Sequence, residues 1–471
     1  MQFEDYRRHD AVALAGLVAK GEVSAAELLE TAVTRMAAVN PAVNAVTLDL
    51  AAQARKAIST SKPEGALGGV PYLLKDLGAA LAGTPTSGGS KMMSQVVAPS
   101  DSGITTAYKQ AGLVIFGKTN TPEFGLMPIT EPTLLGPCRN PWDVARTPGG
   151  SSGGAASAVA AGIVPAAHAS DGGGSIRTPA SACGLFGMKP SRGRVSFAPM
   201  GEGWGGASVQ HAVTRSVRDS AALLDAICRP QPGDPYYLDA PERAFAQEVG
   251  RAPGTLRIAM FPGALASPAL DPECAAAVLD AGRLCESLGH RVEEFTSLPG
   301  DLPAMQLAAG NVIAASVVAN VDAEAARRGK PIAEDELEPL TWGMYRRGQG
   351  VSGGDYVRGL AAIHSYGRAM AGLFESYDVL LLSTLGCPAI PIGHLTQDMA
   401  QFTERLFHFM PNTQAFNNTG QPAMTVPLSW SAGGLPIGLQ FVGKMADEAT
   451  LFRLAGQLEA ARPWFDRVPS L

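Results

Sequence analysis

The sequence predicts an α/β protein in which a mostly parallel or mixed β-sheet is covered by helices on both faces. Short runs rich in Val, Ile and Leu alternate with helical stretches, and these runs lack the polar–apolar alternation of a strand with one face in water. Hydrophobic residues make up 46% of the 471 residues and charged residues only 17%, which is enough apolar material for a large core. Both observations favour a globular protein over a disordered one.

The first expected elements are two helices. An apolar run at 11–19 suits an amphipathic helix. The second helix has Ser24 as its expected N-cap, Glu27 three residues later as in a capping box, and Pro41 as its expected end. Strands buried on both faces are then expected at 69–74, 112–117, 256–261 and 378–383.

The chain is expected to form one domain over residues 1–471. Its length would allow about three domains of ordinary size, but neither a flexible linker nor an internal repeat interrupts the alternation of strands and helices. The stretch at 232–255 reads as a surface excursion between two halves of that domain.

Composition argues against several classes of partner and site. The net charge of −6 argues against binding to nucleic acid or to an anionic membrane. The six cysteines include no C-x-x-C pair, and together with seven scattered histidines they give no pattern of metal ligands. We see no apolar stretch of the roughly 18–20 residues that span a membrane, the longest candidate being interrupted by Pro165. The apolar run near the N-terminus lies among acidic residues and lacks a clear cleavage site, so we expect a cytoplasmic protein.

Two glycine-flanked serine clusters, "GGSSGG" and "DGGGS", are the most informative local feature. The Pro-free, Ala-rich segment 152–162 between them predicts a helix of about 16 Å, and 166–170 predicts a strand of about 17 Å. If the chain reverses between these elements, Ser175 returns beside Ser151 although the two are 24 positions apart. The glycines would allow a close approach of the backbone, and successive N–H groups there would suit an oxyanion hole.

Lys75 is the candidate base for a serine nucleophile. It ends the apolar strand at 69–74, so burial would lower its pKa and supply a neutral amine that accepts a proton. Judged alone, Lys75 would more often be a lysine whose charged end reaches solvent beside Asp76. The serine clusters favour the catalytic interpretation.

Three other motifs match known expressions but lie in the wrong local structure. "GLVIFGKT" at 112–119 matches a phosphate-binding loop, yet its middle residues form the expected strand. "GGSSG" matches the nucleophile elbow of α/β-hydrolases, but a Pro-rich loop precedes it where that elbow needs a strand. "STSK" at 59–62 matches the S-x-x-K of penicillin-recognising enzymes but lies in a polar loop. Nucleotide binding and a Ser–His–Asp hydrolase are therefore less favoured.

Several segments resemble the motifs of the amidase signature family of amide hydrolases, in that family's order. They are "GGVPYLLKDL", "GKTNTPEFG", "GPCRNPWDVARTPGGSSGGAASAVAAG", "ASDGGGSIRTPASACGLFGMKPSRGRVS" and "NNTGQPAMTVPLSWSAGGLPIGLQFVG". The resemblance covers essentially the whole chain and implies a large twisted mixed sheet with helices on both faces. It implies a motif core at about 68–230, a variable substrate-side region at 231–370 and a C-terminal part of the same sheet at 371–471. Within the family the chain most resembles the aminohexanoate cyclic-dimer (nylon-oligomer) hydrolases.

This resemblance implies a Ser–cis-Ser–Lys triad that needs no cofactor or metal. Lys75 would be the base, Ser151 the bridging serine after a cis peptide bond, and Ser175 the nucleophile. Neutral Lys75 would take a proton from Ser151, which would take one from Ser175 as it attacks the amide carbonyl. An acyl-enzyme on Ser175 would then be hydrolysed by water.

The resemblance also implies roles for the residues around the triad. The backbone amides of Gly172, Gly173, Gly174 and Ser175 would bind the oxyanion, and Asp171 and Arg177 would brace this loop. Because Gly172 stands where the family often has Thr, Ile or Ala, we expect a more pliable loop. The flanking serines are expected to be hydrogen-bonding or capping groups; they are Ser152, Ser170 and Ser181.

The expected substrate is a small hydrophobic amide, anilide, carbamate or oligoamide. The alternative is an A-type subunit of an amidotransferase, in which an acidic residue seven positions before the matching Asn417 would hold glutamine. Met410 occupies that position and argues against the alternative. Met127, Trp204 and Trp342 are candidate pocket residues, and a core or surface role is as well supported for each. The resemblance also implies a homodimer, the common oligomeric state in the family.

Overall fold

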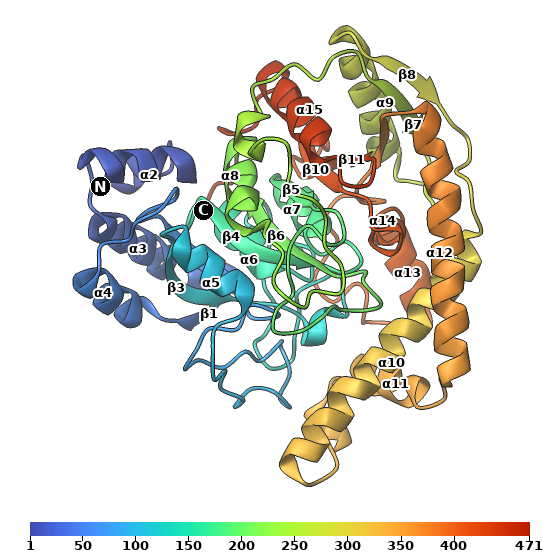
Figure 1. Ribbon diagram of the computed structural model, residues 1–471, viewed down its shortest axis with the longest axis horizontal. Helices are drawn as coiled ribbons and strands as arrows, with labels where there is room; N and C mark the ends of the chain where they lie inside the picture. Colours follow the sequence, from blue (N-terminus) through green and yellow to red (C-terminus); the bar gives the residue numbers. More distant parts are fainter.

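Eleven strands form one mixed β-sheet, with helices on both of its faces, in the computed structural model of residues 1–471 (Figure 1). The strand order is β1-β3-β2-β4-β6-β5-β10-β11-β9-β7-β8. The strands are β1 Val46–Asp49, β2 Pro71–Lys75, β3 Val114–Thr119, β4 Ala166–Asp171, β5 Phe186–Lys189, β6 Val209–Thr214, β7 Arg257–Phe261, β8 Arg291–Glu294, β9 Val379–Ser383, β10 Ala423–Trp430 and β11 Pro436–Gly443. The predicted fold class is confirmed.

The helices fall between these strands, as the alternation predicts. The α-helices are α1 Phe3–Tyr6, α2 Ala11–Lys20, α3 Ala25–Val43, α4 Ala51–Thr60, α5 Gly103–Gln110, α6 Gly153–Ala160, α7 Arg177–Cys183, α8 Val217–Ile227, α9 Pro272–Ser287, α10 Leu302–Arg328, α11 Pro339–Gly348, α12 Gly353–Ser376, α13 Phe402–Phe409, α14 Gln414–Thr419 and α15 Glu448–Ala461. Short 3₁₀ turns cover Glu123–Gly125, Phe245–Gln247 and Glu334–Glu336.

The four expected strands are all present as β2, β3, β7 and β9, each starting one or two residues later than predicted. Every residue of β2 and of β9 is buried, which explains why their sequences are continuous apolar runs. Strands β2 and β3 are parallel, as are β7 and β9, whereas β4 and β6 are antiparallel. The sheet is therefore mixed.

The expected N-terminal helices are α2 and α3, and α3 begins with the predicted capping box of Ser24 and Glu27. Pro41 does not end α3, so that expectation was wrong. The helix continues to Val43 and ends at Asn44, whose φ of 49° takes the chain out of the helix. Pro41 lies in the last turn, where it removes only one N–H donor, and the side chain of Asn40 accepts from the two N–H groups that follow the helix end.

The two serine clusters are joined by the predicted helix and return strand. Helix α6 is shorter than the range expected for it, and strand β4 follows after the turn. A Cβ on Gly150 would lie 2.6 Å from the backbone of Ile129, and one on Gly154 would lie 2.3 Å from the backbone of Asn120. The first cluster is therefore rich in glycine because neighbouring backbone leaves no room for side chains.

Helices α10 and α11 lie side by side and project from the body, while α12 runs along its edge (Figure 1). By length and composition α10 is apolar enough to cross a membrane, with a mean hydropathy of 1.5 in its most apolar 18-residue window. The expectation that no stretch reaches this length was therefore wrong. Polar residues scattered through Leu302–Arg328 break the helix into short apolar runs, so no long run is visible in the sequence. In the structure α10 packs against both α11 and α12.

Candidate active site

Lys75 lies where two neighbouring strands of the sheet separate. Strand β2 pairs with β3 along its whole length, but with β4 only at Leu73 and Ala167. Beyond this pair the fully buried side chain of Lys75 reaches the serine clusters. Its Nζ donates to Oγ of Ser151 at 2.7 Å and to Oγ of Ser170 at 2.9 Å.

Burial changes the acidity of the Lys75 ammonium. Loss of hydration lowers the pKa of Lys75 from 10.5 to about 7, and the negative charge of Asp171 opposes this shift only in part. A large fraction of Lys75 is consequently a neutral amine near pH 7, able to accept a proton.

The peptide bond between Gly150 and Ser151 is cis, as the resemblance implies. Ser151 is buried, and a Cβ on Gly125 would lie 3.1 Å from its Oγ. Ser175 instead lines a cavity. Its carbonyl oxygen accepts from the N–H of Ser152 at 3.3 Å, so the two serine clusters meet as predicted.

Three N–H groups of the loop after β4 have no acceptor within the protein: those of Gly172, Gly173 and Ser175. The fourth expected donor differs, because the N–H of Gly174 donates to Oδ1 of Asp171 at 2.7 Å. The Gly174 amide is therefore removed from the set of oxyanion donors that the resemblance implies. The three remaining groups belong to Ser175, which faces the cavity, and to two residues just before it.

Asp171 and Arg177 form a fully buried ion pair beneath this loop. The carboxylate accepts from Nε and a terminal nitrogen of Arg177 at 3.0 Å each, from the N–H of Ile176 at 3.1 Å, and from Nδ2 of Asn417 at 2.7 Å. Burial alone would raise the pKa of the Asp171 carboxyl, but the charge and hydrogen bonds of Arg177 hold that pKa well below its usual range. The carboxylate thus stays ionised and fixes the loop.

Residues near the C-terminus complete the bracing, and sequence reasoning assigned them no role. Oγ1 of Thr413 donates to the carbonyl of Gly173 at 2.7 Å, and the carbonyl of Thr413 accepts from Arg177 at 3.0 Å. The side chains of Gln440 and Asn417 each accept from Arg177 at 2.5 Å. The sequence could have pointed to two of these residues, because Asn417 and Gln440 lie in the last of the segments that resemble the family.

The flanking serines are hydrogen-bonding groups, as expected. Oγ of Ser152 donates to the carbonyl of Ser170 at 3.1 Å, and Oγ of Ser181 accepts from the N–H of Gly438 at 2.9 Å. The direct contact of Ser170 with Lys75 was not predicted.

A cavity of about 430 Å³ opens over Ser175 and Gly173. Its lining is mostly apolar and includes Met127, Trp204, Leu307, Ile313, Leu340, Phe402, Phe407 and Met410. Arg347 is the only charged residue in the lining. Trp342 does not line the cavity but packs against Tyr345 and a buried cluster that includes Val317 and Val321 of α10, so only two of the three candidate pocket residues are confirmed.

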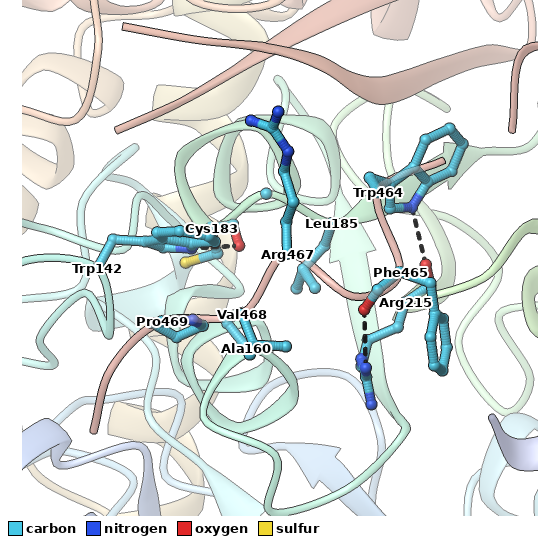
Figure 2. Close-up of a pocket in the computed structure, with 11 residues that line it drawn as sticks. Trp142, Ala160, Cys183, Leu185, Arg215, Trp464, Phe465, Arg467, Val468 and Pro469 are labelled. Carbon is cyan, nitrogen blue, oxygen red and sulfur yellow. Dashed lines mark hydrogen bonds between the residues drawn. The ribbon is translucent and has the colours of Figure 1, made fainter. Parts of the chain in front are cut away.

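A second cavity, shown in Figure 2, lies under the C-terminal segment and is far smaller. Trp464 donates to the carbonyl of Arg215 and Arg215 donates to the carbonyl of Phe465, both at 2.9 Å, which fixes this segment to the body. Its volume of about 10 Å³ admits roughly one water molecule. This cavity is too small for a substrate, whereas the one over Ser175 is much larger.

The apparent phosphate-binding loop is part of the sheet. Its middle residues belong to β3, and Nζ of Lys118 is buried and donates to the carbonyl of Pro85 and to Oγ1 of Thr86. No side chain of this motif is free to hold a phosphate, which agrees with the interpretation from sequence.

A buried lysine of lowered pKa, bonded to one serine and close to a second that faces a large, mostly apolar cavity, is an arrangement suited to nucleophilic hydrolysis. The sequence matches the Amidase family over residues 27–452. It is 36% identical to 6-aminohexanoate-cyclic-dimer hydrolase of Paenarthrobacter ureafaciens, over 98% of this chain and 96% of that protein. The chain belongs to the amidase signature family and is a hydrolase of amide C–N bonds.

Solved structures agree with this assignment. The 6-aminohexanoate cyclic dimer hydrolase in complex with substrate has a TM-score of 0.94 to this protein at 36% identity, covering 98% of each chain. A bacterial aryl acylamidase of the amidase signature family has a TM-score of 0.89 at 27% identity, again covering 98% of each chain.

Proposed function

We propose that this amidase cleaves hydrophobic amides, anilides, carbamates or oligoamides. The support is the cavity over Ser175, whose lining is mostly apolar and contains a single charged residue. A cavity of about 430 Å³ is large enough for an aryl or oligomeric amide. The names of the similar proteins point to the same class, one acting on a cyclic dimer of 6-aminohexanoate and the other being an aryl acylamidase.

The proposed mechanism is acyl transfer to Ser175. Neutral Lys75 accepts the proton of Ser151, which accepts the proton of Ser175 while Oγ of Ser175 bonds to the amide carbon. The free N–H groups of Gly172, Gly173 and Ser175 stabilise the tetrahedral oxyanion. The C–N bond then breaks, the amine takes the proton back through the same relay, and water hydrolyses the acyl-enzyme.

The observation that carries this mechanism is the contact of 2.7 Å between Nζ of Lys75 and Oγ of Ser151, with both side chains buried. A buried lysine without an ionic partner loses stability as a cation, so a proton-accepting role follows from its surroundings. Ser170 is the second contact of the amine and would hold it in place during the relay.

A fluorophosphonate probe with peptide mass spectrometry tests the nucleophile. Ser175 is expected to carry the label, and Ser175→Ala is expected to abolish both labelling and amide turnover. Ser59→Ala is the matched control, since this serine is exposed and begins the S-x-x-K match. Labelling of Ser59, or full activity of Ser175→Ala, would refute the assignment.

The amidotransferase alternative predicts glutaminase activity and a second subunit. Met410 lines the cavity and offers no charge to bind the amino group of glutamine. We therefore propose a small-molecule amide, rather than glutamine in a multi-subunit enzyme, as the substrate. We also propose that the protein binds neither nucleic acid nor membrane and acts as a homodimer in the cytoplasm. Glutamine hydrolysis by the isolated chain, together with light scattering for the oligomeric state, tests these statements.

A further inference from the structure

The departure from the family at Gly172 has a structural cause. A Cβ on Gly172 would lie 2.7 Å from two ring carbons of Trp204 and 3.0 Å from Oγ of Ser208. The indole ring therefore occupies the space that a side chain at position 172 would need. Trp204 also packs directly on a residue whose N–H has no acceptor in the protein.

The backbone of Trp204 lies in an unusual region. Its φ of +57° is in the left-handed region, which bulky residues rarely adopt. The adjacent Gly203, Gly205 and Gly206 allow this conformation, and the latter two also have positive φ values, of 66° and 80°. A bulky residue in this strained region persists only where the surrounding structure holds it.

Asn417 holds the Trp204 loop against the nucleophile loop. Its Nδ2 donates to the carbonyl of Ala207 at 3.1 Å and to both Oδ1 and the carbonyl of Asp171, at 2.7 and 2.9 Å. One buried amide thus connects the two loops on either side of the ring. Gly172 lies against the ring, and neither Gly172 nor Ser208 lines the cavity that Trp204 faces.

We propose that Trp204, packed on Gly172, forms a flat wall of the substrate cavity next to the nucleophile and selects amides whose group beside the scissile carbonyl is planar or unbranched. Trp204 and Ser175 line the same cavity, and the ring packs on Gly172, three residues before the nucleophile, so we expect the group beside the scissile carbonyl to lie against the ring. A planar or straight chain stacks on an indole face, whereas a branched group needs depth that this wall does not give. The proposal rests on the proposed function of Ser175.

Three acyl groups of different shape test the wall. Wild-type protein, Trp204→Ala and Trp204→Phe are assayed with the p-nitroanilides of butyric, benzoic and pivalic acids. Trp204→Ala is expected to lower kcat/KM for the butyryl and benzoyl substrates by about 2- to 10-fold, mainly through KM, because it loses a stacking contact. Activity on the branched pivaloyl substrate should be maintained or rise, and Trp204→Phe should keep the wild-type preference. An unchanged ratio of unbranched to branched kcat/KM in folded Trp204→Ala overturns the proposal.

A double-mutant cycle tests the contact itself. Gly172→Ala alone is expected to lower kcat by about 100-fold, because the new methyl group displaces the ring or the loop. Added to Trp204→Ala, the same substitution should cost at most about threefold, since the ring is gone. An equal cost in both backgrounds overturns the proposal.

Labelling with the fluorophosphonate probe separates this proposal from the proposed function. If wild-type protein is not labelled at Ser175, the proposed function fails. If every variant is labelled but the acyl preference does not change, only the role of Trp204 fails. Circular dichroism and Tm confirm that each variant is folded. If Trp204→Ala does not fold, Trp204→Leu, which removes the flat ring but keeps an apolar side chain, takes its place with the same expected and overturning results.

Discussion

The pH dependence of catalysis should report the titration of Lys75. The pKa of Lys75 is about 7, so about half of it is neutral at pH 7, whereas a hydrated lysine at that pH is neutral in only about one molecule in 3,000. Only the neutral amine accepts a proton, so activity must fall on the acid side. We expect kcat/KM to be level above about pH 8 and to drop about tenfold per pH unit below 7, reaching roughly 1% at pH 5.

The assay is hydrolysis of a chromogenic anilide between pH 5 and 10 at constant ionic strength. Lys75→Ala should lose several orders of magnitude at pH 7 and should no longer show the acid limb. Lys189→Met is the matched control, because Lys189 is another fully buried lysine, with a pKa that burial lowers to about 7. The acid limb must persist in Lys189→Met. An acid limb near pH 10, or one that disappears with Lys189 and not with Lys75, would refute the reasoning.

Other substitutions test single contacts around the site. Ser170→Ala removes one of two partners of Lys75 and should lower kcat about tenfold while leaving the acid limb; an unchanged kcat would mean that Ser151 alone positions the amine. Asn417→Ala leaves buried partners on two loops unsatisfied and should destabilise the protein by about 1–3 kcal/mol, measured as a lower Tm and contradicted by an unchanged one. His168 accepts the backbone N–H of Lys75 at Nδ1 at 3.2 Å, where β4 no longer pairs with β2. His168→Asn keeps an acceptor there and should retain most of the activity, whereas His168→Leu should lose about 10- to 100-fold; equal losses in both would contradict this role.

The sequence predicts the arrangement of Lys75 and the two serine clusters better than the walls of the cavity. The glycines that precede Ser151 and Ser175 indicate close backbone approach, and the matching lengths of helix and strand bring the two serine clusters together. Lys75 ends a continuous apolar run, so its burial also follows from local sequence. These predictions succeed because they depend on short segments.

Predictions that depend on distant packing are less complete. The Gly174 amide faces Asp171, three residues earlier, because Arg177 and Asn417 orient that carboxylate. Trp342 lies outside the cavity although its neighbours on α11 line it. No local pattern distinguishes such cases, since each depends on which residues a distant segment brings to the same place.

The walls of the cavity and the reacting groups come from different parts of the chain. Lys75 ends β2, Ser175 follows β4, the neighbouring strand, and Ser151 lies just before α6, while much of the wall comes from α10, α11 and α13, outside the sheet. Mutations in these helices can alter the size and shape of the cavity without moving the sheet that holds the proton relay. Directed evolution toward a new amide should therefore tolerate many changes in these three helices and few in the sheet. A library confined to cavity-facing positions of α10, α11 and α13 is the natural starting point for such an experiment.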